Sequence, residues 1–291
     1  MENILAVPRR FAVAFHPGLD DASHISNEVS RFLLEKGAEQ VDTGTVYDDW
    51  LNDRLSSNNY DMVIAMGGDG TILRAGHLCA SRNIPLMGIN VGHFGFLTEV
   101  GRENWPNALL EILNGRYRLE ERLMLEIEHI RGDQSLGRWQ AINEVVICRG
   151  QFVRPIRLTA SVNGFRTTTY VADGLIVATP TGSTAYSLAA GGPILPPEAR
   201  NLLIVPVAPH LSMDRAIVLP EGACVTVQVN TSHEAVLSVD GHPPVLVIDG
   251  DRVESSTSSN RLQMVRLKDP GYFYRNITLY MEHNPSAGTI V

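Results

Sequence analysis

Cysteine, long apolar runs and basic charge are all scarce in this sequence. Its 291 residues include three cysteines, Cys79, Cys148 and Cys224, which lie far apart in apolar surroundings. Such spacing fits neither a disulfide framework nor a cysteine metal site, so we expect reduced core thiols in a cytoplasmic protein. No stretch approaches the length of a membrane span. The apolar segment of a signal peptide does not follow residues 1–10.

Acidic residues outnumber basic ones. The chain has 24 Lys and Arg against 32 Asp and Glu, a formal net charge of −8. This balance argues against nucleic acid as the main partner, although it is compatible with a local basic pocket for a phosphorylated ligand. The nine histidines show no metal-ligand spacing, and no Gly-x-Ser-x-Gly elbow is present. We therefore expect no dedicated metal site, no nucleic-acid partner and no membrane partner.

The first 115 residues alternate between short apolar runs and segments with helical periodicity. This order predicts a parallel sheet with helices on both faces, a Rossmann-like arrangement in three layers. We expect strands at 10–15, around 41, at 60–66 and at 85–90, and helices at 21–36, 48–56, 71–82 and 104–114. Ligands of such sheets bind beyond the carboxyl ends of the strands.

After residue 115 the pattern changes, and strand follows strand. Alternating polarity predicts strands at 124–131, 139–148, 156–162, 166–171, 173–178, 202–207, 223–229, 235–239 and 244–248. Asn163-Gly164 and Asp249-Gly250 are typical of hairpin turns, and Ser255–Ser259 is interpreted as a polar turn. We therefore predict an α/β domain over 1–117 and an all-β, antiparallel, sandwich-like domain over 118–269.

A glycine-rich turn is the strongest functional signal in the first domain. Gly67-Gly68-Asp69-Gly70-Thr71 follows an apolar strand and opens a helix. Glycines there permit positive φ and close approach of a ligand to the backbone, and a helix N-terminus favours phosphate. The turn matches neither a Walker A loop nor a Rossmann fingerprint. The candidate phosphate ligands are Gly67, Gly68, Thr71 and, one turn into the helix, Arg74.

Asp69 is the one carboxylate within this anion-favouring turn. Such a group can accept a proton from a substrate hydroxyl or hold a metal ion. The alternative is an ordinary tight turn, in which the Asp side chain bonds its own backbone.

Two further stretches lie in the β-rich half. Thr179 to Pro193 combines dense hydroxyls with small residues, which suits either a ligand cradle or a capped helix packed on a sheet. Asn143-Glu144 opens an apolar strand, and its donors and acceptors could bind a ribose diol. The alternative for that pair is a solvent-facing strand end.

Taken together and in this order, these motifs closely resemble the NAD kinase family. The resemblance rests on Gly67 to Thr71, Gly92 to Leu97, Asn143-Glu144 and the run from Asp173-Gly174 through Thr179 to Ser187. It covers about Tyr60 to Asp240. It implies an α/β domain, a β domain, and a last segment, about 270–291, that returns to the first domain.

The resemblance also assigns roles to residues. Asp69 matches the proton acceptor with Gly70 beside it, Asn143 and Glu144 match a ribose-binding pair, and Asp173 matches a contact to the nicotinamide half. The remaining residues assigned to NAD binding are Phe96, Arg154 near a phosphate, Thr181, Thr184, Ala185, Tyr186, Ser187, Ala189, Asp240 and His242. Val171 replaces an Arg common in relatives and Phe94 replaces the commoner Leu after His93, so cofactor preference and feedback behaviour are not carried over.

The implied reaction is transfer of the γ-phosphoryl group of ATP, or of polyphosphate, to the 2′-hydroxyl of the adenosine ribose of NAD. Mg²⁺ would arrive with the nucleotide, and the resemblance implies a homo-dimer or homo-tetramer. Two alternatives remain open at this point. Lipid and sugar kinases share the glycine turn, and a non-catalytic dinucleotide sensor would keep the pocket without turnover.

Overall fold

The computed structural model describes residues 6–19, 21–47, 49–57, 59–92, 95–210 and 213–282, with side chains of the last helix described through Leu279. The chain forms two compact units, Met1–Glu121 with Leu262–Val291 and Arg122–Arg261. The chain thus passes from the first unit to the second after Glu121 and returns after Arg261, where the sequence suggested boundaries near 117 and 270.

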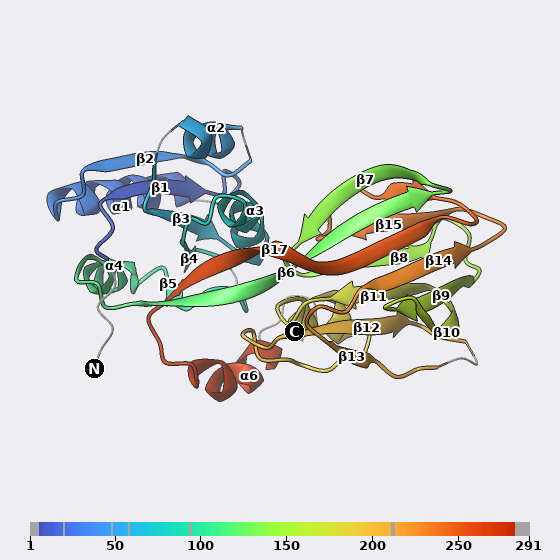
Figure 1. The fold of residues 1–291 in the computed structure, drawn as a ribbon. Helices are drawn as coiled ribbons and strands as arrows, with labels where there is room; N and C mark the ends of the chain where they lie inside the picture. Colours follow the sequence, from blue (N-terminus) through green and yellow to red (C-terminus); the bar gives the residue numbers. More distant parts are fainter. Residues whose placement is uncertain are drawn as a thin grey trace. The chain divides into compact units, whose positions relative to one another are not determined.

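The first unit is a parallel sheet between helices (Figure 1). Its strands run in the order β2-β1-β3-β4, and every pair is parallel. Its elements are β1 (Arg10–Phe15), α1 (Ala22–Glu35), β2 (Gln40–Thr45), α2 (Trp50–Ser57), β3 (Met62–Gly67), α3 (Asp69–Ala80), β4 (Leu86–Asn90), β5 (Val100–Gly101), α4 (Trp105–Leu113) and α6 (Tyr272–Glu282). The α/β prediction is confirmed, with boundaries shifted by a few residues; residue 48, the expected start of α2, lies outside the described residues.

Apolar residues on both faces of this sheet explain its three layers. Phe11 and Val13 of β1 share one buried core with Val29 of α1 and Leu109 of α4. On the opposite face α3 buries Ile72 together with the small residues Ala75, Cys79 and Ala80. A strand that is buried on both sides reads as a continuous apolar run, which is why β3 was recognisable from sequence.

The last part of the chain returns to this unit, as the resemblance implied. Met264 in β17 (Arg252–Arg266) pairs in parallel with Leu86 of β4. Val265 belongs to the core of the first unit. Helix α6 follows, so the return begins within β17, before residue 270.

The second unit is an antiparallel sandwich of two sheets. One sheet has the order β13-β12-β11-β8-β15-β16, and the other contains β10-β9-β14-β17 together with the β6–β7 hairpin. The strands not yet given are β6 (Arg118–Arg131), β7 (Gln134–Ala141), β8 (Glu144–Arg149), β9 (Ile156–Val162), β10 (Phe165–Ala172), β11 (Gly174–Ala178), β12 (Asn201–Val207), β13 (Ile217–Pro220), β14 (Val225–Asn230), β15 (Ala235–Val239) and β16 (Val245–Val247). Inward residues such as Leu158 and Val227 of one sheet and Val145 and Leu175 of the other form one core.

Two predictions in this unit are wrong. The expected strand 139–148 is two strands, because the chain breaks at Ile142–Asn143, where the Asp240 carboxylate binds successive backbone amides. The expected polar turn Ser255–Ser259 lies inside β17. Its serines are compatible with a strand because Ser258 is buried and its Oγ accepts a hydrogen bond from Gln140 over 2.9 Å.

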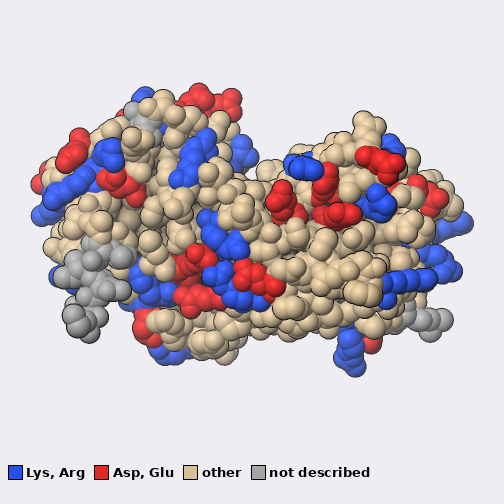
Figure 2. Space-filling model, in the orientation of Figure 1, with Lys and Arg blue, Asp and Glu red and all other residues tan. Residues whose placement is uncertain are grey.

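On the face drawn in Figure 2, basic and acidic side chains lie interspersed among uncharged ones. Among the described residues, no helix is long and apolar enough to cross a membrane. All three cysteines are free; Cys79 is buried, whereas Cys148 and Cys224 are half-buried, so only Cys79 is the core thiol that the sequence suggested.

Candidate active site

The glycine turn joins β3 to α3 at the carboxyl edge of the parallel sheet. Gly68 is the N-cap of α3 with φ −89°, and neither Gly67 nor Gly70 has a positive φ. The glycines are therefore needed for space and not for a left-handed backbone. A Cβ on Gly67 would collide with the side chain of Thr71, which is 2% exposed. Beside Gly68 and Gly70 the space is open, so a ligand can approach the backbone there.

Asp69, the first residue of α3, is anchored by a second loop. Its Oδ2 accepts a hydrogen bond from the Phe96 amide over 2.9 Å, and its Oδ1 accepts one from the Leu97 amide over 3.2 Å. Gly95 lies so close that a Cβ there would overlap the carboxylate. Amide donors favour the charged form of a carboxylate and fix its orientation. His93 and Phe94, which precede this loop segment, lie outside the described residues.

Arg74 has two neighbours that sequence reasoning missed. Its Nε donates to the Val46 carbonyl over 2.9 Å, and its guanidinium lies 5.0 Å from the ring centroid of Tyr47. The ring centroids of His16 and Tyr47 lie 4.9 Å apart, and the two rings form a T-shaped pair. His16 follows β1 directly and Tyr47 lies two residues beyond β2, so a search for polar and aromatic residues just after each predicted strand would have found them.

In the second unit, Asp240 builds the strand start that carries Asn143 and Glu144. Its Oδ2 accepts from the Ile142 amide over 2.7 Å, and its Oδ1 accepts from the Asn143 and Glu144 amides over 2.9 Å each. Asp240 itself has a φ of 46°. Its carboxylate therefore fixes the backbone of the candidate ribose-binding pair.

Glu144 is an almost fully buried carboxyl group. It is 7% exposed, and its Oε2 has no hydrogen-bond partner in the structure. The pKa of Glu144 is raised to about 8, mainly by burial and also by the nearby Asp240 charge, while a hydrogen bond from the Tyr186 amide acts in the opposite direction. A buried polar atom without a partner costs free energy, so Oε2 is suited to a ligand hydroxyl.

The loop after β11 packs on this pair. Thr179 Oγ1 donates to the Ile142 carbonyl over 2.5 Å and accepts from the Gly182 amide over 3.1 Å. A Cβ on Gly182 would collide with the Asn143 backbone. Thr179 and Gly182 are thus positioning residues, which sequence reasoning had placed in the cradle without a role.

Beyond this contact the loop forms the short helices η1 (Gly182–Thr184) and α5 (Tyr186–Ala189). Thr181 is buried, and its Oγ1 accepts a bond over 3.2 Å from Arg122, a buried arginine that the sequence did not single out. Tyr186 is 45% exposed and is therefore not a core residue.

The other residues of this loop differ in accessibility. Thr184 Oγ1 donates to the Thr181 carbonyl over 3.1 Å, and Ala185 is the N-cap of α5. Ser187 is fully buried and its Oγ has no partner, whereas Ala189 is exposed.

Three other candidates lie in the same unit, and the charge of one of them, Asp173, is close enough to Tyr186 to help raise the pKa of that phenol, behind burial. Asp173 forms an ion pair with Arg149 over 3.1 Å. Arg154 lies on the exposed loop between β8 and β9, where its carbonyl lies 3.1 Å from the Nε2 of His233. His242 is exposed in the turn after β15, and its amide bonds to the Val239 carbonyl.

The structure therefore groups the candidates by unit. In the first unit it brings the glycine turn, Asp69 and the amide of Phe96 together, with Arg74 one helical turn away. In the second unit it brings Asn143, Glu144, Asp240 and the Thr181–Tyr186 loop together. Within the described part of the chain, no group of three or more His, Cys, Asp or Glu side chains is placed to hold a metal ion.

Comparisons with known proteins point to one family. The model of the ATP-NAD kinase N-terminal domain matches residues 44–117, and the model of the ATP-NAD kinase C-terminal domain matches residues 142–267. An NAD kinase of Chloroflexus aurantiacus is 38% identical over 268 residues, which cover 92% of this chain and 96% of the relative. An NAD kinase of Dehalococcoides mccartyi is 35% identical over 279 residues, which cover 95% and 97%.

Two solved structures share the fold. The crystal structure of yeast NADH kinase complexed with NADH matches with a TM-score of 0.78 at 23% identity, covering 96% of this chain and 89% of that one. An NAD kinase from Archaeoglobus fulgidus in complex with ATP matches with a TM-score of 0.70 at 25% identity, covering 93% and 98%.

Proposed function

Because the chain belongs to the NAD kinase family, its activity is phosphoryl transfer to NAD, and we propose which atoms and residues carry it. The γ-phosphoryl group of ATP goes to the 2′-hydroxyl of the adenosine ribose of NAD, and NADP is formed. Lipid kinase, sugar kinase and non-catalytic sensor are not favoured, since both domain models and the relatives point to NAD kinases.

Asp69 is the proposed general base. The 2′-hydroxyl must lose its proton as the new P–O bond forms, and a positioned carboxylate that accepts it contributes about 10²–10⁴-fold in rate. The observation that carries this assignment is the pair of hydrogen bonds from the Phe96 and Leu97 amides. They fix the Asp69 carboxylate beside the open backbone of Gly68 and Gly70. Gly67, Gly68, Thr71 and Arg74 are proposed to bind phosphate at the start of α3.

NAD recognition is proposed for residues of the second unit. Glu144 and Asn143 bind a ribose, which supplies the missing partner for Glu144 Oε2. Tyr186 stacks on adenine, supported by its exposure at the start of α5. Phe96, Arg154, Asp173, Thr181, Thr184, Ala185, Ser187, Ala189, Asp240 and His242 remain proposed NAD-binding residues on the strength of the resemblance.

The other proposals concern the metal, the assembly and the location. A group of three or more potential ligands is lacking among the described side chains, so Mg²⁺ is proposed to bind mainly through the phosphate oxygens of the donor. Bound there, it would neutralise phosphate charge. A homo-dimer or homo-tetramer is proposed from the family resemblance, and a cytoplasmic location from the free cysteines.

The test is formation of NADP from NAD, ATP and Mg²⁺, detected with an NADP-specific dehydrogenase. Parallel reactions with NADH as acceptor and polyphosphate as donor define the substrate range. The expected result is NADP formation that requires both substrates, with the new phosphate on the 2′ position. Binding of NAD without NADP formation would instead support a sensor.

A further inference from the structure

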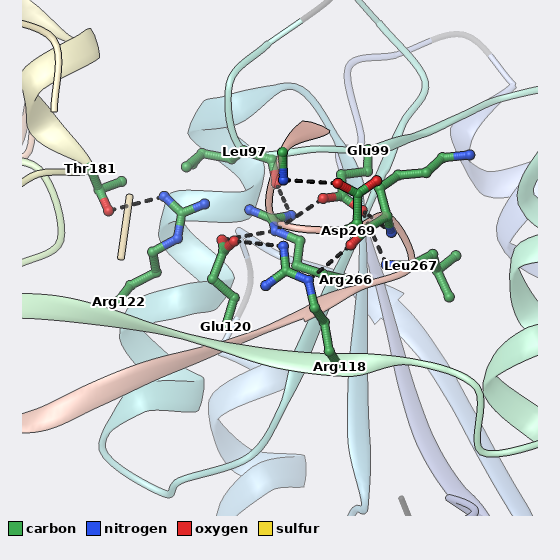
Figure 3. Close-up of polar contacts among 11 residues, drawn as sticks. Leu97, Glu99, Arg118, Glu120, Arg122, Thr181, Arg266, Leu267 and Asp269 are labelled. Carbon is green, nitrogen blue, oxygen red and sulfur yellow. Dashed lines mark hydrogen bonds and ion pairs between the residues drawn. The ribbon is translucent and has the colours of Figure 1, made fainter. Parts of the chain in front are cut away.

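A buried arginine holds the loop that holds Asp69. Arg266, the last residue of β17, donates from Nη1 to the Leu97 carbonyl over 2.9 Å (Figure 3). The amide of the same Leu97 donates to Asp69 Oδ1. A single residue therefore separates the guanidinium from the carboxylate, although Arg266 and Leu97 are 169 positions apart in the sequence.

Two carboxylates fix Arg266 in turn. Its Nε donates to Glu120 Oε1 over 2.9 Å, and Glu99 Oε1 lies 3.6 Å away. The other oxygen of Glu99 accepts from the amides of Leu267 and Lys268 over 3.1 and 3.2 Å. Figure 3 shows this network around the end of β17. The guanidinium has little freedom to move relative to Leu97.

The burial of this network argues for a geometric role. Arg266 is 3% exposed and Glu120 is 4% exposed. A buried ion pair of this kind contributes little net stability compared with apolar residues of similar volume. A guanidinium can bond a carboxylate and a carbonyl at once with fixed angles, which a lysine ammonium does less well. The arrangement therefore suits a part that must hold a backbone segment in one place.

We propose that Arg266 is a positioning residue for phosphoryl transfer, which fixes the Leu97 carbonyl and thereby the Phe96 and Leu97 amides that orient Asp69. The inference rests on the proposed role of Asp69 as general base. Arg266 acts through Leu97 and is not assigned a contact with substrate. Small misplacements of a reacting group can cost about a hundredfold in rate.

The first test is Arg266→Lys. This variant keeps the positive charge between Glu99 and Glu120, but its ammonium cannot bond the carboxylate and the Leu97 carbonyl at the same fixed angles. We expect kcat to fall about tenfold to a hundredfold. The KM values for NAD and ATP should stay within about twofold, because the lost interaction acts in the transition state. The acid limb of the pH–rate profile should move to higher pH, since a carboxylate with weaker amide donors binds its proton more tightly.

Arg261→Lys is the matched control. Arg261 lies on the same strand, pairs with Glu221 over 2.7 Å and bonds the Asn260 carbonyl over 3.0 Å. It has no part in the Asp69 network described above, so its variant should keep the wild-type kcat and pH profile. Equal losses in both variants would mean that any weakened ion pair on β17 slows the enzyme, and would overturn the specific role of Arg266.

Hydrogen exchange at the Phe96 and Leu97 amides gives a readout that does not depend on activity. Exchange there should speed up in Arg266→Lys and stay at the wild-type rate in Arg261→Lys. If Arg266→Lys does not fold, the double variant Arg266→Met with Glu120→Gln removes one charge of each sign and serves the same purpose. Wild-type kcat and wild-type exchange in the folded variant overturn the proposal.

The two hypotheses fail in different ways. If Asp69→Asn loses turnover while Arg266→Lys keeps it, the general base stands and the positioning role of Arg266 is overturned. If the wild-type protein forms no NADP, the proposed function fails and the catalytic role of Arg266 fails with it. The exchange rates then still decide whether Arg266 holds the Asp69 loop.

Discussion

Two carboxyl groups, one in each unit, have opposite surroundings. Asp69 accepts hydrogen bonds from two backbone amides. Glu144 is buried with one oxygen unpartnered, and burial raises its pKa to about 8. Amide donors stabilise a charged carboxylate, whereas burial favours the neutral acid. The first group is therefore held in one orientation by donors, whereas the second leaves one oxygen available to a polar ligand.

Both groups depend on backbone held from far away in the sequence. The Asp69 bond partner Phe96 lies 27 positions along the chain, and the Asp240 carboxylate that fixes the Glu144 amide lies 96 positions away. Asp69 is surrounded by hydrogen-bond donors, the amides of Phe96 and Leu97. Glu144 instead has a second carboxylate, that of Asp240, as a neighbour.

Among the variants that keep Asp69 itself, Gly95→Ala should be the most damaging. The added methyl group would overlap the Asp69 carboxylate, so the carboxylate or the loop must move and kcat should fall about a hundredfold. The control is Gly101→Ala, where a Cβ meets no atom within 4 Å and φ is not positive. Steady-state kinetics of both variants decide the matter, and a wild-type kcat in Gly95→Ala would show that close packing at Asp69 is unimportant.

The pH dependence of stability tests the neutral state of Glu144. Its folded-state pKa of about 8 lies above its ordinary value, so the folded protein keeps a proton that the unfolded chain loses. Stability from this group is therefore full at acid pH and declines as pH rises toward 8, by up to about 1.4 kcal/mol per unit. Measured at pH 5, 7 and 9, the melting temperature of Glu144→Gln should rise relative to that of the wild-type protein as the pH increases. If the difference in melting temperature between variant and wild type did not change with pH, Glu144 would not be a neutral acid in the folded protein.

The same variant should weaken NAD binding more than ATP binding. Glu144→Gln leaves a group of nearly the same shape, but it replaces one carboxyl oxygen with an NH2 group. That group cannot accept a hydrogen bond from a ribose hydroxyl, which costs about 1–3 kcal/mol. Calorimetric titration with each nucleotide measures the effect. A shift in the ATP constant with an unchanged NAD constant would place the ribose elsewhere.

Tyr186→Ala should have an effect that is confined to ligand binding. Because Tyr186 is 45% exposed, its loss should change the melting temperature of the free protein little. Loss of stacking on adenine should weaken NAD binding by roughly 1–3 kcal/mol and reduce the melting increase that NAD gives. Tyr274→Ala, at a 60% exposed tyrosine, is the control and should change neither quantity. Unaltered NAD affinity in Tyr186→Ala removes this residue from the site.

The sequence predicted those features that depend on local patterns. The alternation of strands and helices, the turn around Asp69 and the Asn143-Glu144 pair at a strand start could all be identified from neighbouring residues. The resemblance named Phe96 as an NAD-binding residue, and the structure shows in addition that its amide donates to Asp69. The roles of Arg266 and of the Asp240 carboxylate depend on partners separated by many residues.

The two wrong strand predictions have the same origin. The break at Ile142–Asn143 is made by the Asp240 carboxylate, 98 positions from Ile142. The serine-rich stretch in β17 is stabilised as a strand by partners such as Gln140, 118 positions from Ser258. Local composition favours a turn there, and tertiary contacts override that preference.

The most direct test of the central claim is the single-turnover rate of NADP formation by Asp69→Asn. The variant is saturated with NAD, mixed with ATP and Mg²⁺, and compared with wild type at the same NAD occupancy. We predict unchanged NAD binding and a rate about 10²–10⁴-fold lower, with the phosphate of any product on the 2′-hydroxyl. A near wild-type rate in this variant would contradict the assignment of Asp69 as the proton acceptor.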